Sequence, residues 1–356
     1  MPGPEMEGDQ IDDLIRTQYA NLEDPEWWKS LEAEGVVLYA WGDGKYWKIA
    51  RAIQSSGAKL VTHMDTAGIL GIFNGLDVFV HSLWHSSTSK YGRGIKALLH
   101  TTLRFAYAVS VGLIKNDYRR ILHLNCADII GVISPIAADR IHKVCQFYGG
   151  DDMTSKIRLI PHPNASYMSF NPDISKERMV CAIGRWDDEV TKGTALLCQT
   201  MELLTVKDRY VQIEIYGRVP QSMRKWHESL NETTQSRILL KGVVTNSELK
   251  PALQRARISV CTSYREGYHT VSAEALCCGC SIIGPNVDSI PSLKWFTDGP
   301  HGDLAARNKD ALTDCLLHEL SKWDSGERDA AAISKKWTAR LHASNVARQI
   351  IGLAND

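Results

Sequence analysis

Residues 258–284 read ISVCTSYREGYHTVSAEALCCGCSIIG and contain the pattern that decides the fold. Ile258–Cys261 and Ser281–Ile283 are short apolar runs typical of buried strands, and a helical pattern that contains Glu274 separates them. Buried strands that alternate with helices are typical of a parallel sheet covered on both faces. The loop Thr262–Thr270 then follows the first strand at its carboxyl end, where open α/β sheets bind their ligands.

The same alternation extends through the second half of the chain. The expected strands are Val180–Ile183, Val211–Tyr216 and Ile238–Leu240, and the expected helices include Thr194–Leu204 and Ser247–Arg255. This order predicts a doubly wound, Rossmann-like domain over residues 173–335. Ile333–Leu353 is helical, and we expect residues 336–356 to form a helix that packs back on the N-terminal domain.

The first half predicts a second, shortened Rossmann-like domain over residues 1–172. The expected strands, about four, are Val36–Trp41, Lys59–His63, Asp128–Ile133 and Ile157–Ile160. A long helical stretch lies between the second and the third. Residues 1–34 are acidic and predict a helical extension, which we expect to pack on the sheet through Leu14, Trp27 and Trp28. The polar run Asn171–Arg178 is expected to link the two domains.

The composition excludes several classes of function. Of the 356 residues 44% are hydrophobic, and 41 Lys and Arg balance 41 Asp and Glu, so no global positive field is available to bind nucleic acid. Nine cysteines without the spacing of a disulfide framework indicate reduced thiols and a cytoplasmic location. The acidic N-terminus has no apolar signal core, and we expect no window to reach the roughly 18 apolar residues of a membrane span.

A local basic surface is expected between Lys90 and Arg120. This stretch holds about seven basic residues, with Asp117 as its single acid. Because it is also rich in aromatic residues, it would suit peripheral contact with anionic lipid headgroups on the inner face of a membrane. A plain solvated face is the alternative.

Three expected strand ends carry residues suited to bind a ligand. Gly184-Arg185 follows one strand directly, and Lys192-Gly193 opens the next helix, so two cations flank one loop and could converge on a diphosphate. Lys241-Gly242-Val243 ends another strand, where a flat base could lie against the backbone. In the loop 262–270 and the helix after it, Glu266 and Glu274 could accept hydrogen bonds from vicinal hydroxyls.

Together and in this order, these segments resemble the retaining glycosyltransferases of family 4, within glycosyl transferases group 1. The matching segments are Gly184-Arg185, Lys192-Gly193, Tyr216-Gly217, Lys241-Gly242 and, above all, Glu266 through Glu274 to Gly284. The resemblance covers about residues 36–345. It implies the GT-B fold, in which two Rossmann-like domains with parallel sheets face a cleft.

The resemblance also implies roles for individual residues. Arg185 and Lys192 would bind the donor diphosphate, Glu274 the ribose, and Glu266 the transferred sugar. The other donor-binding positions that it implies are Gly184, Gly217, Gly242, Val243, Gly267, Tyr268, His269 and Thr270.

The implied activity is transfer of a hexose or N-acetylhexosamine from a nucleoside diphosphate sugar, with retention of configuration. UDP is the expected nucleotide because it is frequent in the family. The acceptor would be a hydroxyl of a glycan, a lipid-linked sugar or a small molecule. Neither a cofactor nor a metal is expected, since nowhere does a single residue separate two Asp residues, as in the metal motif of the other major glycosyltransferase fold.

Several other residues are weaker candidates. His63 follows an expected strand where the family often has a histidine facing the transferred sugar; a hydrogen-bonded strand-end histidine is the alternative, and Asp65 competes if the alignment slips. The cysteines of residues 277–280 suit small buried positions at a helix end better than a metal site. His81 and His85 lack the glutamate of a zinc-protease helix.

A second function stays open. Members of the family usually begin with further strands and a glycine-rich loop, whereas only an acidic helical segment precedes Val36 here. Gly42-Asp43-Gly44 is a plain turn or a substitute for that loop. The alternative is therefore a non-catalytic nucleotide-binding subunit that depends on a partner.

Overall fold

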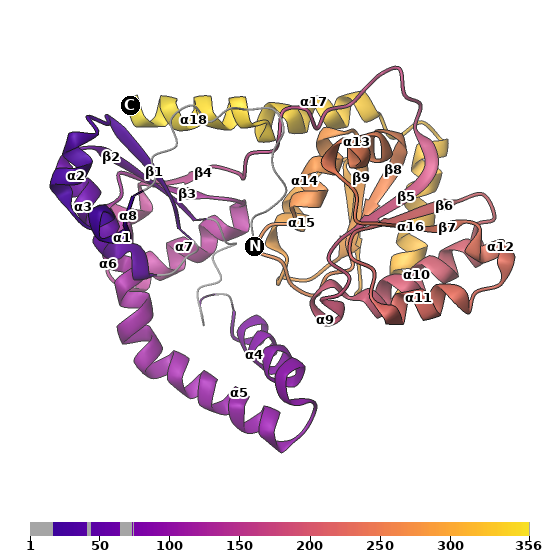
Figure 1. Cartoon of the computed structure of the whole chain (residues 1–356), viewed down its shortest axis with the longest axis horizontal. Helices are drawn as coiled ribbons and strands as arrows, with labels where there is room; N and C mark the ends of the chain where they lie inside the picture. Colours follow the sequence, from indigo (N-terminus) through magenta and orange to yellow (C-terminus); the bar gives the residue numbers. More distant parts are fainter. Residues whose placement is uncertain (1–16, 41–43, 65–72, 74, 356) are drawn as a thin grey trace.

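The computed structural model describes residues 17–40, 44–64, 73 and 75–355. Two α/β lobes lie side by side, the N-terminal one in indigo and magenta and the C-terminal one mainly in orange (Figure 1). Each lobe is built on a parallel sheet. The predicted class, two Rossmann-like domains with parallel sheets, is confirmed.

The N-terminal sheet has four strands in the order β1-β2-β3-β4. They are β1 Gly35–Ala40, β2 Lys59–Met64, β3 Ile129–Val132 and β4 Ile157–Leu159. Within the described residues, the predicted number of strands is confirmed. The helices that pack with this sheet are η1 Gly44–Tyr46, α3 Trp47–Ser56, α7 Pro135–Phe147 and α8 Asp151–Thr154.

Two short helices precede the first strand, α1 Tyr19–Leu22 and α2 Pro25–Ser30. They pack on α3, and Trp28 lies against the N-terminal core while its indole N–H donates to the Leu22 carbonyl at 2.9 Å. Trp27 instead meets Trp28 edge to face, with ring centroids 4.8 Å apart. One of the two tryptophans therefore packs as predicted, and Leu14 lies outside the described residues.

A long helical segment joins β2 to β3, as the sequence predicts. Its elements are α4 Leu76–Tyr91, α5 Ile95–Tyr107, the π-helix η3 Ala108–Asp117 and α6 Tyr118–Cys126. Helices α4 and α5 form a hairpin that projects from the lobe (Figure 1). The segment returns to the core in α6, where Ile121 and Leu124 are buried.

Helices α5, η3 and α6 run on as one helix of 32 residues, Ile95–Cys126. It contains a window with a mean hydropathy of 1.4, of which only 17% is buried, so by length and composition it could cross a membrane. The expectation that no window reaches this range is wrong. Because α6 is packed in the N-terminal core, this helix is anchored to the lobe at its C-terminal end.

The C-terminal sheet has six parallel strands in the order β10-β9-β8-β5-β6-β7. They are β5 Glu177–Ile183, β6 Gln212–Tyr216, β7 Ile238–Gly242, β8 Ala256–Val260, β9 Ser281–Pro285 and β10 Gly302–Ala305. The five strands predicted here are confirmed. The edge strand β10 was missed because it is four residues long and includes Asp303, so it presents no apolar run.

Helices cover both faces of this sheet and enclose two cores. On one face, α10 Thr194–Lys207 and α16 Lys309–Asp324 pack over the strands; on the other lie α13 Asn246–Arg255, α14 Thr270–Cys277 and α17 Ala330–Leu341. The shorter helices are α9 Glu189–Lys192, α11 Gln221–Glu228, α12 Glu232–Gln235 and α15 Pro291–Phe296. The predicted doubly wound arrangement is present.

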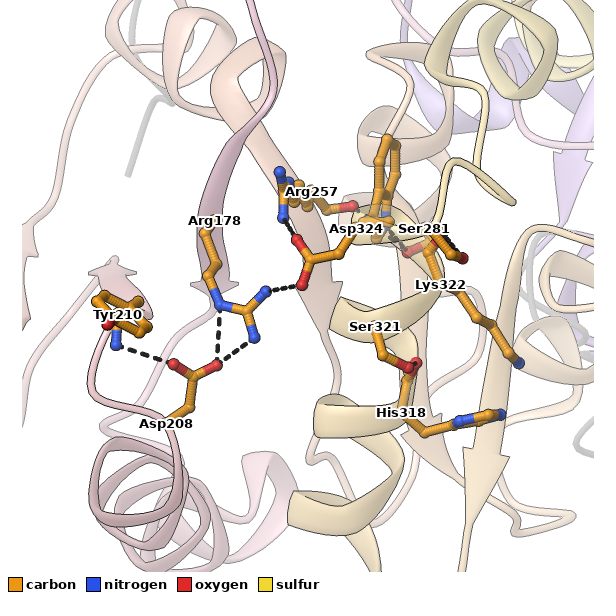
Figure 2. A network of polar contacts seen from close by, with 11 residues as sticks. Arg178, Asp208, Tyr210, Arg257, Ser281, His318, Ser321, Lys322 and Asp324 are labelled. Carbon is orange, nitrogen blue, oxygen red and sulfur yellow. Dashed lines mark hydrogen bonds and ion pairs between the residues drawn. The ribbon is translucent and has the colours of Figure 1, made fainter.

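An ion-pair network closes the amino-terminal edge of this sheet (Figure 2). Arg178 of β5 donates through Nε and Nη2 to Asp208, at 2.9 and 2.5 Å, and pairs with Asp324 at the end of α16. Asp324 also accepts from Arg257 of β8 at 2.7 Å. The network joins two strands to the ends of α10 and α16, at the edge opposite the carboxyl ends of the strands.

The C-terminal helix pattern breaks at His342, which has extended backbone angles, and continues as α18 Ala343–Asn355. Helix α17 packs on α14 in the C-terminal lobe, whereas α18 lies against β2, where Val346 and Ile350 meet Val61 and Ile160. The chain therefore crosses between the lobes at residue 342, and the boundary predicted at residue 336 falls inside α17.

Candidate functional site

The carboxyl ends of β5, β6 and β7 meet at three glycines. The Gly184 amide donates to the Tyr216 carbonyl at 3.1 Å, and the Gly217 amide donates to the Gly242 carbonyl at 2.7 Å. Gly217 has a φ of 108°, and a Cβ at this position would lie 1.9 Å from the Gly184 carbonyl oxygen. Only glycine fits there, which lets the backbones of neighbouring strand ends approach closely.

Lys192 reaches a neighbouring strand end because Gly193 follows it. Gly193 has a φ of 67°, and a Cβ would lie 2.3 Å from the Thr262 carbonyl oxygen. The Thr262 hydroxyl donates to the Lys192 carbonyl at 3.0 Å, and the Tyr264 amide donates to Thr191 at 2.7 Å. These contacts hold the loop after β5 against the loop after β8.

Lys192 and Glu266 form a partly buried ion pair at this junction. The ammonium lies 2.5 Å from Glu266 Oε1, each side chain is 15% exposed, and the Ser263 hydroxyl donates to the same oxygen at 2.6 Å. Burial acts to raise the pKa of Glu266. The charge of Lys192 and the hydrogen bonds from Lys192 and Ser263 outweigh burial, so the pKa of Glu266 lies below its ordinary value.

His269 is not the cation that keeps Glu266 ionised near neutral pH. Burial lowers the pKa of His269 to about 4, so its ring is neutral there. We therefore assign the stabilisation of the Glu266 carboxylate to Lys192 and Ser263. The His269 ring hydrogen-bonds through Nδ1 to the Ser272 hydroxyl at 2.6 Å, and its amide donates to Ser292 Oγ at 3.2 Å.

Glu274 is a partly buried carboxylate on α14. Within the part of the chain that the structure describes, its side chain makes neither a hydrogen bond nor an ion pair, and burial raises its pKa to about 7. A carboxylate with unused acceptor oxygens can bind vicinal hydroxyls. The chemistry of this side chain thus matches the role that the resemblance implies.

The other predicted donor-binding residues differ in accessibility. Arg185 and Thr270 are exposed, Val243 is 73% exposed, and Gly267 is partly buried. Arg185 therefore lies at the surface beside Gly184, while Lys192 is drawn into the ion pair. The two predicted diphosphate ligands are thus not equivalent in this structure.

Tyr268 links the two lobes. Its ring meets His162 of the N-terminal lobe at 5.0 Å and Phe296 of α15 at 5.4 Å, and it packs against the cores of both lobes. Its hydroxyl is buried and has no hydrogen-bond partner among the described residues. The side chain acts as packing between the lobes, so only its backbone remains for the implied contact with the donor.

His63 is fully buried in β2, and the ring of His162 contacts both His63 and Tyr268, a residue of the loop that carries Glu266. Its Nε2 donates to the Ile160 carbonyl at 2.9 Å, and its ring lies between Tyr39 and His162. Burial and the neighbouring His162 lower its pKa to about 4. These contacts agree with the alternative, a hydrogen-bonded strand histidine, and a role of His63 at the transferred sugar stays a prediction; Asp65 lies outside the described residues.

Sequence reasoning missed the contact between α4 and the loop after β8. His85 stacks on Tyr264, with ring centroids 4.7 Å apart and planes at 8°, and His81 bonds to the Tyr264 hydroxyl. Arg265 donates to Ser82 on the same helix. The pair His81 and His85, four residues apart on one face, was the available signal, but the sequence favoured solvated or core histidines over a contact with another loop.

The cysteines of residues 277–280 lie in the C-terminal core. Cys280 donates to the Leu253 carbonyl at 3.0 Å, and burial raises the pKa of all three thiols. Over the described ranges, no group of three or more His, Cys, Asp or Glu residues could hold a metal ion. The interpretation of these cysteines as small buried residues agrees with this packing.

A family model described as Glycosyl transferases group 1 matches residues 177–322, which include all six strands of the C-terminal sheet. The gpi3 subunit of the phosphatidylinositol N-acetylglucosaminyltransferase of Schizosaccharomyces pombe is 25% identical over 174 residues. That alignment covers 46% of this chain and 38% of the relative, so this chain matches less than half of that protein.

Solved structures resemble the chain over both lobes. Anabaena HepE in complex with UDP aligns with a TM-score of 0.59 at 13% identity, over 92% of this chain and 80% of that one. The pneumococcal O-GlcNAc transferase GtfA, in complex with UDP and GlcNAc, aligns with a TM-score of 0.55 at 15% identity, over 93% and 59%. The chain therefore has the GT-B fold, and its C-terminal lobe, which matches glycosyl transferases group 1, supports a GT-B glycosyltransferase.

Proposed function

We propose that this chain is a metal-independent, retaining glycosyltransferase that moves a sugar from a UDP-sugar to a hydroxyl of a glycan, lipid-linked or small-molecule acceptor. The observation that carries the proposal is the pairing of Lys192 with Glu266 where the loops after β5 and β8 meet. The match to glycosyl transferases group 1 and the UDP complexes of HepE and GtfA support the donor class.

Each side chain has a distinct task in the proposed reaction. Lys192, joined by the exposed Arg185, neutralises the negative charge that develops on the departing diphosphate. Glu274 accepts hydrogen bonds from the ribose hydroxyls. Glu266 contacts the transferred sugar, where a carboxylate stabilises the positive charge that the ring gains as the glycosidic bond weakens.

The proposed step needs no enzymic nucleophile. The bond between the anomeric carbon and the β-phosphate oxygen breaks, and the bond to the acceptor oxygen forms on the same face of the sugar. The acceptor proton passes to the departing phosphate oxygen, so charge and atoms balance.

In this proposal each lobe binds a different substrate. Residues 173–335 bind the nucleotide sugar, and residues 1–172 face the acceptor. The surface of the hairpin also favours peripheral binding to the inner face of a membrane from the cytoplasm. The exposed apolar side chains of α5 and of the adjoining η3 include Ile95, Leu98, Leu99, Leu103 and Ile114, and basic residues at positions 93, 96, 104 and 115 flank them.

The test is a panel of nucleotide sugars with UDP, GDP and ADP as bases, incubated with the whole chain and assayed for release of the nucleoside diphosphate. We expect hydrolysis above background with a UDP-sugar, and loss of that signal in Glu266→Gln. Background rates with every donor, combined with tight binding of UDP, would instead favour the alternative, a non-catalytic subunit. This alternative is supported by the small N-terminal sheet, which has four strands in the described residues.

A further inference from the structure

Helix α4 is the arm of the hairpin that lies toward the C-terminal lobe (Figure 1). Side chains one turn apart on this helix meet two consecutive residues of the loop after β8. Residues three and four positions apart share one face of a helix, so these side chains form one continuous surface. The residues of the contact are His81, Ser82, His85, Tyr264 and Arg265.

The ring of Tyr264 is the centre of this contact. His85 stacks on it, with ring centroids 4.7 Å apart and planes at 8°, and the Tyr264 hydroxyl bonds to His81. The guanidinium of Arg307, from the segment that follows β10, lies 5.2 Å from the centroid of the same ring. A stacked ring, a cation and a hydrogen bond together fix the orientation of this side chain as well as its position.

His85 contributes to the contact through stacking. Burial lowers its pKa, and the charge of Arg307 lowers it further, although Asp188 acts the other way. The ring is therefore neutral near pH 7. Its Nε2 is buried and makes no hydrogen bond within the described residues. An uncharged aromatic ring of similar size would thus preserve the contact with Tyr264.

The backbone next to Tyr264 is held by the C-terminal lobe. The Tyr264 amide donates to the Thr191 carbonyl at 2.7 Å, and its carbonyl accepts from the Ser289 hydroxyl at 2.5 Å. Two residues on, the Glu266 amide donates to the Ser289 carbonyl at 3.2 Å. The segment that ends in Glu266 is therefore held by its own lobe through the backbone and by α4 through its side chains.

Helix α4 is itself fixed to the N-terminal lobe. The Ser87 hydroxyl bonds to His100 Nδ1 at 2.9 Å, and Arg104 donates to the Ser86 hydroxyl at 2.9 Å; His100 and Arg104 both belong to α5. Helix α5 runs on through η3 into α6, which is packed in the N-terminal core. The position of α4, and with it the contact to Tyr264, is therefore set by the N-terminal lobe.

We propose that Tyr264 is a positioning residue: stacked on His85 of α4, it holds Glu266 at the transferred sugar, so that the N-terminal lobe completes the donor site of the C-terminal lobe. This inference rests on the proposed function, whose site it extends to α4. Loss of the stacking leaves the backbone bonds of the loop, and the proposed contacts of Glu274 with the ribose, in place. It should therefore affect the transfer step more than the binding of UDP.

The first test compares turnover with UDP binding in the whole chain. His85→Ala should slow hydrolysis of a UDP-sugar roughly tenfold, because small displacements of a reacting group have effects of this order. The Kd for UDP, measured by calorimetry, should change by less than about twofold. His85→Phe retains a flat ring and should restore turnover. His318→Ala is the matched control, because His318 is an exposed histidine on α16.

A double variant tests whether His85 and Tyr264 act through the same contact. Tyr264→Ala alone should slow turnover at least as much as His85→Ala. If both side chains serve one contact, the variant that carries both changes should be no slower than Tyr264→Ala. Losses that multiply would mean that the two residues act independently, which would overturn the proposal.

Amide hydrogen exchange tests the same contact without any activity. The peptide that covers residues 262–270 should exchange faster in His85→Ala than in the wild type, His85→Phe or His318→Ala. Exchange in β5 and β6 should stay unchanged, which separates a local release of the loop from a general loss of stability.

Two further results would overturn the inference. Unchanged exchange of residues 262–270 in His85→Ala would show that α4 does not hold the loop, and faster exchange with normal turnover would remove Tyr264 from the positioning of Glu266. The proposed function fails separately: a wild-type chain that binds no UDP and hydrolyses no donor would refute it, and the exchange of His85→Ala would still decide whether α4 holds this loop.

Discussion

Lys192 Nζ lies 2.5 Å from Glu266 Oε1, so the cation assigned to the diphosphate and the carboxylate assigned to the sugar are direct partners. In the proposed reaction, a diphosphate that binds Lys192 shares this ammonium group with Glu266. Binding of the donor therefore alters the environment of the carboxylate next to the transferred sugar. The two roles are coupled through one contact.

Removal of Lys192 should affect both stability and turnover. Lys192→Ala leaves Glu266 with the Ser263 hydroxyl alone, so we expect a loss of about 1–3 kcal/mol in the free energy of unfolding. Loss of an electrostatic contact to the departing group should also slow turnover roughly 10²–10³-fold. In the double variant Lys192→Ala, Glu266→Gln, urea titration should recover much of the stability, whereas turnover stays low. Normal turnover in Lys192→Ala would remove this residue from the reaction.

The two glutamates should differ in what they contribute. The ribose is unchanged during the reaction, so Glu274→Ala should weaken the binding of UDP. The transferred sugar gains positive charge in the transition state, so Glu266→Gln should bind UDP almost normally and transfer slowly. Calorimetry with UDP and steady-state rates separate the two effects. The reverse pattern would show that the roles are assigned to the wrong positions.

Gly217 and Gly242 form a matched pair at the strand ends. Both have positive φ, but a Cβ at Gly217 would lie 1.9 Å from the Gly184 carbonyl oxygen, whereas a Cβ at Gly242 meets nothing within 4 Å. Gly242→Ala should cost about 1 kcal/mol for the left-handed backbone alone. Gly217→Ala must displace backbone, so it should destabilise the chain more and abolish UDP binding. Equal thermal denaturation midpoints for the two variants would contradict the close packing.

The hairpin should bind anionic vesicles. Ile114 is 77% exposed and Ile95 is 78% exposed, so Ile114→Glu removes apolar contact and adds repulsion without disturbing the core. We expect the wild-type chain to sediment with vesicles of phosphatidylcholine and phosphatidylserine, and less so in high salt. Val206→Glu is a control, because Val206 is 70% exposed on α10, in the other lobe. Sedimentation that is absent, or indifferent to salt, would favour the solvated face.

The alternation of apolar runs and helices predicted the strands of both sheets, because buried parallel strands must be apolar along their length. This criterion did not predict β10, because β10 lies at the edge of the sheet and contains Asp303. The apolar pattern also did not predict the break between α17 and α18. The pattern of apolar residues runs through His342, and the break there depends on the backbone bridge to Asn164, a contact distant in sequence.

The candidate site, too, could be predicted only in part from the sequence. Strand ends and spacing predicted which segments carry the chemistry, but not that Lys192 would pair with Glu266, since that depends on how closely Gly193 approaches Thr262. Nor could the sequence show that α4 would reach Tyr264. Position along a strand also did not show that His63 would be buried between Tyr39 and His162, because a strand end does not say which residues cover the side chain.

Glu274 should make stability depend on pH. Burial raises the pKa of its carboxyl in the folded chain to about 7, from an ordinary value of 4.5. Between these pH values the folded chain holds a proton that the unfolded chain has lost, so stability falls as the pH rises through this window. Above it, the ionised carboxylate costs on the order of 3 kcal/mol of stability. Glu274→Gln should therefore match the wild type in urea below the window and be more stable above it.

The same carboxyl should report on the nucleotide. If the ribose hydroxyls donate to Glu274, binding stabilises the ionised form and lowers its pKa, so UDP should displace a proton near neutral pH. Titrations in two buffers of different ionisation enthalpy measure this release, and Glu274→Gln should abolish it while Glu248→Gln, at the exposed capping box of α13, should not. Proton release that persists in Glu274→Gln would assign it to another group and separate Glu274 from the ribose.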